Sequence, residues 1–420
     1  MKNLIITLLM VSYMSISMHI DAQQSNEDTK YRRSSLEMIL LESKDFPNKN
    51  AVMASWDGYP FPDKYNEHDI ISESFNINEI VLNQEDLLKA GFSKDLPPTA
   101  KQLAKLKVDQ IIKDQNVAKK MIAMWFNRSL DGKFDMSLIQ ERGFYNASEL
   151  EASVAEGQAR GLASLGDAGV ELIRNTFVTF TALDFYENEP FVRAIRDEAI
   201  NQINSSEMEG FAKELAIKAA EKVYEKTKEG YSLWSATWLY QLNWNDSIAA
   251  VFYNDLWADP IGFDNSNIFS LEFVNVQYNQ SLVTFKIGEK RTKEELIDIV
   301  LVRNVDNAFA KLQKKNEIFK PMVPVLTANP ITAKIGMKEG LKGGEKFNVL
   351  EMTLNSETGL TEYKQIGTVK ADKKSIWDNR YNAGGKNENE KFDKQGNLIS
   401  VTLFKGGKNI QPGMLLKQAK

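Results

Sequence analysis

Apolar residues recur along the first three quarters of the chain with two different periods, which together predict a mixture of helices and strands. A spacing near 3.6 residues runs through 100–125, 190–228 and 293–315, and it predicts three helical regions. The second region is expected to break near Asn204. Its apolar side chains are expected to face a core. They are Ile195, Ile200, Ile203, Phe211, Leu215 and Val223.

A period of two predicts the clearest strand, at 233–244, where every even position is apolar or aromatic. We expect this even face to belong to the core, with a sugar-stacking platform as the alternative reading of its rings. A second strand is predicted at 176–185 from its β-branched and aromatic residues. Segment 269–287 predicts two further strands around Asn279, and Asn146 is expected to cap a helix that ends near residue 165.

The pattern changes after Pro330, where helical periodicity stops and glycine becomes frequent. Residues 331–420 contain twelve of the 24 glycines, which predicts short strands joined by glycine turns. The expected strands are 346–354, 363–370, a stretch near Trp377, 398–404 and 414–417. The chain is therefore predicted to be α+β: a mixed helix and sheet domain over 34–330, with two subdomains as an option, and a small all-β, glycine-rich domain over 331–420.

The first 22 residues have the pattern of a secretory signal peptide. Lys2 precedes an apolar run, 4–18, that is short for a membrane span, and small Ala22 marks the expected cleavage site. Polar residues 23–33 are expected to form a flexible leader. These features predict a periplasmic or secreted protein that is soluble and has no transmembrane segment once the signal is removed.

Composition narrows the chemistry further. The net charge of −5 comes from 52 basic and 57 acidic residues without a long cationic block, so nucleic-acid binding is not expected. The chain has no cysteine, which excludes disulfides and also the lipid anchor of bacterial lipoproteins. After signal removal a single histidine, His68, remains.

Few residues suggest catalysis. His68 lies between carboxylates in Asn66–Asp69, where a metal ligand or general base is conceivable but a structural hydrogen bond is the favoured interpretation. A glycosidase-type carboxylate pair is chemically available, although no spacing singles out two acids. Glycines 340, 343 and 344 lack the spacing of a phosphate-binding loop and predict turns. No catalytic residue, metal ligand or cofactor is predicted.

Three C-terminal stretches carry a resemblance: 340–350, 367–370 and 410–415. Their turn and strand motifs resemble the small β-barrel module found at the C-terminus of some periplasmic envelope-assembly proteins, which implies a barrel that packs against partners. The whole chain, including Trp377–Arg380 and Pro62–Tyr65, is similar to a family of exported proteins of Gram-negative bacteria. That second resemblance implies export and brings no activity with it.

These observations favour a non-enzymatic exported protein that binds or scaffolds an assembly of the cell envelope, with an envelope protein as its partner. Trp377 and Arg380 are the candidate binding residues, because a tryptophan beside an arginine is a common interface anchor. The competing interpretation is that Trp377 fills the barrel core and Arg380 pairs with Asp378. The alternative function is an envelope glycan hydrolase that uses two carboxylates.

Overall fold

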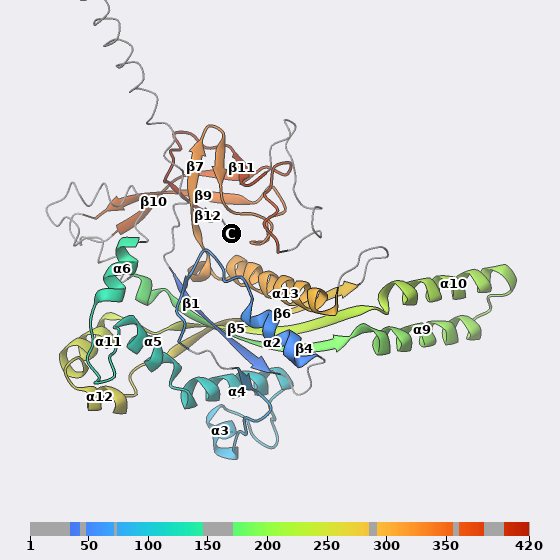
Figure 1. The fold of residues 1–420 in the computed structure, drawn as a ribbon, viewed down its shortest axis with the longest axis horizontal. Coiled ribbons are helices and arrows are strands. Elements are labelled where there is room, and N and C mark those ends of the chain that lie inside the picture. Colours follow the sequence, from blue (N-terminus) through green and yellow to red (C-terminus); the bar gives the residue numbers. More distant parts are fainter. Residues whose placement is uncertain are drawn as a thin grey trace, which may run out of the picture. The chain divides into compact units, whose positions relative to one another are not determined.

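The computed structural model describes residues 34–42, 48–70, 74–145, 171–284, 292–355, 361–381 and 399–419 (Figure 1). These residues fall in one compact unit, Tyr31–Lys420. The predicted signal peptide, the leader at 23–33 and the helix expected after Asn146 lie outside the described residues. Among the described helices, none combines the length and the apolar character that a membrane crossing requires.

The chain is α+β, as predicted, and its larger sheet has six strands. The strand order is β2-β1-β4-β5-β6, with β3 also pairing with β1. Strand β1 runs parallel to β4, whereas β4, β5 and β6 are antiparallel neighbours. The strands are β1 Ser35–Glu42, β2 Asn66–Glu67, β3 Phe75–Asn76, β4 Thr176–Glu187, β5 Gly230–Leu242 and β6 Leu271–Thr284.

Helices cover both faces of this sheet. On the even face of β5, Trp238 and Tyr240 pack in a core cluster with residues of α4 and α5. On the odd face, Leu233 and Leu239 pack with residues of α13. The even face is therefore core over most of its length, as expected. The helices are α2 Lys49–Asp57, α3 Gln84–Lys89, α4 Ala100–Asp114, α5 Val117–Trp125, α6 Ser137–Tyr145, α11 Asp246–Val251, α12 Pro260–Asn265 and α13 Lys293–Lys315.

Two predictions about the number of helices and strands in a segment differ from the structure. The helix expected at 100–125 is two helices, because Asn116 between α4 and α5 takes the left-handed conformation, with φ of 50°. The two strands expected at 269–287 are one long strand, β6, in which Asn279 pairs opposite Ser235 of β5. An Asn-Gln pair can stay inside a strand when the neighbouring strand continues beyond it.

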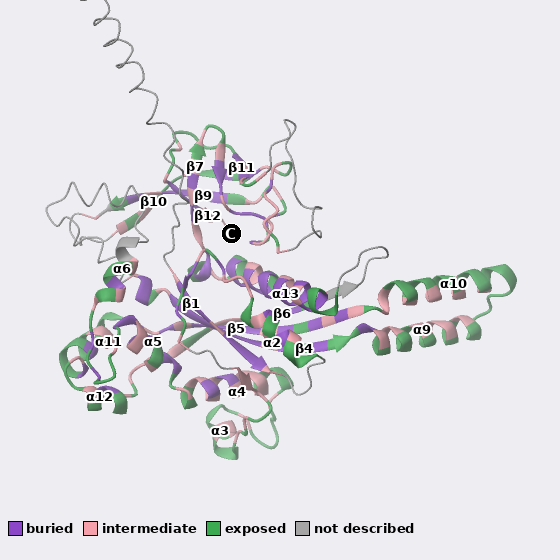
Figure 2. Ribbon diagram, viewed as in Figure 1, coloured by how far each residue is buried: buried purple, intermediate pink, exposed green. Residues whose placement is uncertain are grey.

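Beyond the sheet, β4 and β5 are connected by two antiparallel helices, α9 Asn188–Ser205 and α10 Gly210–Thr227 (Figure 1). We call this pair the arm. The predicted helical region and its break are confirmed, but the expected burial is wrong. None of the residues from Glu189 to Glu229 is fully buried, as the green and pink ribbon of Figure 2 shows.

The C-terminal region forms a closed six-stranded barrel in the order β10-β11-β8-β7-β12-β9. It starts earlier than residue 331, because β7 pairs with both β8 and β12. Pro330 therefore lies in the turn between the first two barrel strands. Trp377 forms only an isolated bridge with Gly336, where a strand was expected. The strands are β7 Met322–Ala328, β8 Ile331–Ala333, β9 Lys346–Leu354, β10 Thr361–Ala371, β11 Thr402–Lys405 and β12 Leu415–Gln418.

Helix α13, predicted with the correct bounds, is buried on more than one side. Thr292 and Glu295 form a capping box that fixes its start. Buried Asn304 enters the sheet side and bonds to Ser235, while buried Asp306 bonds to Tyr59 and Lys338. This helix therefore brings polar groups into contact with the sheet and with the segment that precedes β9.

Candidate functional site

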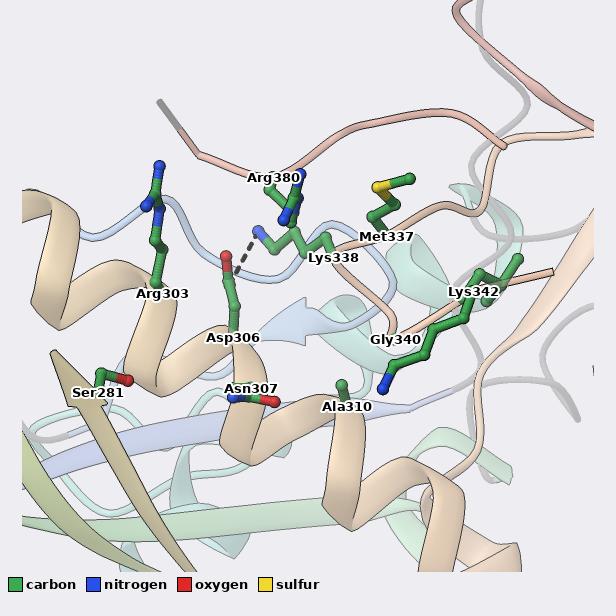
Figure 3. Close-up of a pocket in the computed structure, with 11 residues that line it drawn as sticks. Ser281, Arg303, Asp306, Asn307, Ala310, Met337, Lys338, Gly340, Lys342 and Arg380 are labelled. Atoms are coloured by element: carbon green, nitrogen blue, oxygen red, sulfur yellow. Dashed lines mark ion pairs between the residues drawn. The ribbon is translucent and has the colours of Figure 1, made fainter. Parts of the chain in front are cut away.

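A cavity of about 630 Å³ lies over α13, and we call it the α13 pocket (Figure 3). Helix α13 contributes residues at positions i, i+3, i+4 and i+7, which share one face of a helix. The facing wall comes from the loop between β8 and β9 and from Arg380. The lining residues are Ser281, Arg303, Asp306, Asn307, Ala310, Met337, Lys338, Gly340, Leu341, Lys342 and Arg380.

Small residues let the loop approach the helix closely. Gly340 has a positive φ of 81°, and a Cβ added to it would lie 3.3 Å from the Cβ of Ala310. A larger side chain at either position would push the loop away from α13. The glycine turn expected here is confirmed, and its position explains why the pocket has a defined wall.

A partly buried set of hydrogen bonds ties the loop to the segment that carries Arg380. The Glu339 carboxylate accepts from the Gly336 backbone N–H at 2.7 Å and from the Asn379 amide at 3.0 Å. Asn379 in turn accepts from the Lys338 backbone N–H at 2.8 Å. Two chain segments that are about forty residues apart are thus held together at the pocket.

Asp306 is the one carboxylate among the lining residues, and it is buried. The Tyr59 hydroxyl donates to its Oδ1 at 2.8 Å, and the Lys338 Nζ lies 3.5 Å from the same oxygen. Its Oδ2 has no hydrogen-bond partner among the described residues. Burial raises the pKa of Asp306 above its usual value, and the charge of Lys338 opposes that rise.

Four cations line the pocket, Arg303, Lys338, Lys342 and Arg380. Arg303 has a partner, and Arg380 is paired with Asp378. The charge of Lys338 is compensated only by Asp306, whose Oδ1 lies 3.5 Å from the Lys338 Nζ and whose pKa is raised. The Lys342 side chain has no ion pair within the described residues. The pocket therefore favours a negatively charged group.

The two binding residues predicted from the sequence, Trp377 and Arg380, lie in different surroundings. Arg380 lines the α13 pocket and is exposed, while its Nε and Nη2 donate to Asp378 at 2.8 and 2.7 Å. Trp377 is half-buried and does not line the pocket. Its neighbour Ile376 fills the barrel core instead. The competing interpretation is thus right for the Arg380–Asp378 pair, whereas it assigned the wrong residue to the core.

His68 has the structural role that was favoured for it. Its ring is buried, its Nε2 lies 3.2 Å from the Met121 carbonyl oxygen, and it contacts the Trp125 ring. Burial lowers the pKa of His68 to about 3, with a smaller contribution from the positive charge of Arg142. Among the described residues, no three His, Cys, Asp or Glu side chains are grouped so that they could hold a metal ion, and His68 therefore belongs to no such group.

The arm is the second candidate site, because it exposes large apolar side chains. Its helices meet through Glu189 and Arg196 of α9 and Glu221 and Tyr224 of α10. Exposed fractions are 64% for Phe191, 53% for Ile195 and 60% for Val223, and Phe211 near the tip reaches 80%. Such side chains usually help to form an interface when several occur together.

The arm has an apolar side and a charged side. Ile195 and Val223 each precede a contact residue, and in two antiparallel right-handed helices such positions project to the same side of the pair. Phe191, one turn before Ile195, extends this side, and the three residues form what we call the arm patch. Asp197 and Glu225 each follow a contact residue and lie on the opposite side, where the neighbouring positions are also polar.

Tryptophans elsewhere offer little ligand surface. Trp234, at the end of β5 next to the arm, is the exposed one at 48%. Trp56 and Trp257, considered as stacking residues if exposed, are half-buried and pack against the core clusters. The alternative of a sugar-stacking face on β5 therefore keeps only Trp234.

Two features of these sites escaped the sequence reasoning. Arg303, Asp306 and Asn307 are polar residues that share one face of α13, a signal that helical spacing could have revealed. The arm was treated as a core element because its apolar spacing matches that of a buried helix.

No protein-family model matches the chain, and no curated protein shows significant similarity to it.

Proposed function

We propose that this protein is a non-enzymatic, exported protein that binds a partner protein of the cell envelope, and that the arm is its contact surface. The observation that carries the proposal is the arm patch: three large apolar side chains, each more than half exposed, on one side of the helix pair that projects from the sheet in Figure 1. Export and the envelope location rest on the pattern of residues 1–22 and on the family resemblance.

Energetics favour a partner for this surface. Covering one fully exposed Phe, Ile or Val side chain contributes about 1.5–3 kcal/mol. Three side chains that are more than half exposed therefore offer several kcal/mol to a binding partner before the costs of association. The opposite side carries exposed, charged Asp197 and Glu225, so covering it would not contribute this free energy.

Site-specific photocrosslinking in the native cells tests the proposal. A benzoylphenylalanine at position 195 is expected to capture one defined envelope protein, because this position is in the arm patch. The same probe at position 197, one residue further on the charged side, is the matched control and is expected to capture none. A probe at position 377 or 380 tests the barrel surface that the sequence first favoured.

A charge substitution provides the second readout. Ile195→Glu places a carboxylate in the apolar patch and is expected to abolish co-purification of the captured protein. Asn201→Glu adds the same charge one turn after Asp197 and is expected to leave it unchanged. Capture from position 377 or 380, with none from 195, would show that the barrel and not the arm is the contact surface. Capture of a second copy of this chain alone would show that the arm patch serves self-association and not binding of an envelope partner.

The hydrolase alternative gains no support from the described residues. A carboxylate pair in a cleft beside exposed tryptophans was the geometry that would favour it. The α13 pocket is lined by one carboxylate, Asp306, and exposed Trp234 is not among its lining residues.

A further inference from the structure

We propose that the α13 pocket binds a small organic anion, a hydroxylated compound such as a sugar that carries a phosphate or carboxylate group. This inference goes beyond the proposed function, since it uses no residue of the arm. It starts from two lysines of the lining: Lys342 has no ion pair within the described residues, and the Lys338 Nζ has only Asp306, at 3.5 Å. A phosphate or carboxylate oxygen is the usual partner of such groups.

The cations lie at two levels along α13. In the view of Figure 3, Arg303, Lys338 and Arg380 lie toward the Arg303 end of the pocket, and Lys342 lies toward Ala310. Seven residues separate Arg303 from Ala310, which is a rise of about 10 Å along a helix. A ligand that reaches both levels is larger than an inorganic phosphate, and the volume of about 630 Å³ accommodates it.

Neutral polar and apolar groups complete the lining. The Asn307 amide and the Ser281 hydroxyl can exchange hydrogen bonds with ligand hydroxyl groups. Met337, Leu341 and Ala310 supply apolar surface for the carbon skeleton. This mixture fits a hydroxylated organic anion better than a purely apolar acid, which would leave the polar groups unpaired.

Two of the cationic groups, Arg380 and Lys338, are held in place before a ligand arrives. Asp378 fixes the Arg380 guanidinium through Nε and Nη2, so its Nη1 group takes no part in that pair. Asp306 pairs with the Lys338 Nζ, and the Lys338 backbone N–H donates to the Asn379 Oδ1, so both contacts position Lys338. A preformed charge arrangement reduces the ordering cost of binding.

Isothermal titration calorimetry at low, constant ionic strength tests the proposal with four probes. Glucose 6-phosphate and glucuronate separate a phosphate from a carboxylate ligand, glucose tests the sugar without the acid, and inorganic phosphate tests the anion alone. We expect saturable binding of at least one of the two acidic sugars, with much weaker binding of glucose and inorganic phosphate. Binding should weaken as salt increases.

Variants locate the site. Lys342→Gln is expected to weaken binding of the acidic sugar about tenfold, because it removes one charged contact from the pocket. Lys364→Gln, which removes an exposed lysine from β10, is the matched control and should change the affinity less than twofold. The proposal fails if neither acidic sugar binds, if inorganic phosphate or glucose binds as tightly, or if both variants weaken binding equally.

Discussion

His68 shows how the environment of one residue sets a property of the folded protein. Its pKa of about 3 in the folded state lies below the usual value of 6.5, so the unfolded chain binds a proton that the folded chain does not. Stability is therefore fully present above pH 6.5 and is lost as the pH falls toward 3. At pH 4.5 the loss amounts to about 2.7 kcal/mol, from 1.36 kcal/mol per pH unit.

His68→Phe tests this dependence, because phenylalanine keeps the ring contact with Trp125 and does not titrate. Urea unfolding at pH 7.5 and pH 4.5 should show that the wild type loses about 2–3 kcal/mol more free energy of unfolding than the variant. The variant also loses the hydrogen bond to Met121, but this loss lowers the free energy of unfolding by the same amount at both pH values. An equal loss in the two proteins would mean that His68 does not drive the acid sensitivity.

At the scale of elements, the break between α4 and α5 depends on a backbone conformation. Asn116 is exposed and left-handed, so its side chain contributes little packing. Asn116→Gly should change the free energy of unfolding by less than about 0.5 kcal/mol, whereas Asn116→Val should lower it by about 1–2 kcal/mol or more, because β-branched residues are strained there. Urea denaturation measures both, and equal effects would show that the left-handed turn is not a constraint.

The same break explains a limit of the sequence reasoning about elements. Apolar residues keep helical spacing across 100–125, so period alone predicts one helix and cannot show where the axis changes direction. Strand β6 illustrates the reverse error, since Asn279 suggested a turn until its pairing with Ser235 was known. Helix α13 was predicted correctly from spacing alone, and the structure shows a Thr292–Glu295 capping box at the residue where that spacing begins.

At the scale of the whole molecule, the fold class could be predicted but the candidate sites largely could not. Glycine turns predicted an all-β C-terminal domain, the resemblance to a barrel module implied its closure, and β9 has the predicted bounds. The α13 pocket needs a loop and a helix to meet, which depends on the contact between Gly340 and Ala310. The arm patch depends on the absence of a covering element in the described chain, and periodicity does not distinguish a partner in another molecule from a core in the same one.

Contacts between α13 and the C-terminal region lead to a prediction about cooperativity. Asp298 of α13 accepts from the Tyr381 hydroxyl at 2.6 Å and from the Ser55 hydroxyl at 3.0 Å. Buried Lys320, after α13, donates to the carbonyl of Gln418 at 3.1 Å. Such part-buried charge-assisted bonds contribute up to about 1.5–3 kcal/mol each, which is enough to couple the barrel to the rest of the fold.

We therefore expect the barrel and the large sheet to unfold together in urea. Of the seven tryptophans, only Trp377 lies in the barrel region, so fluorotryptophan labelling and fluorine NMR can follow that region separately. All seven resonances should change at one urea concentration. Asp298→Ala should lower this common midpoint, because it leaves the Tyr381 and Ser55 hydroxyls without their acceptor. A Trp377 resonance that changes alone, in the wild type, would show that the barrel is an independent unit joined to α13 by contacts too weak to couple them.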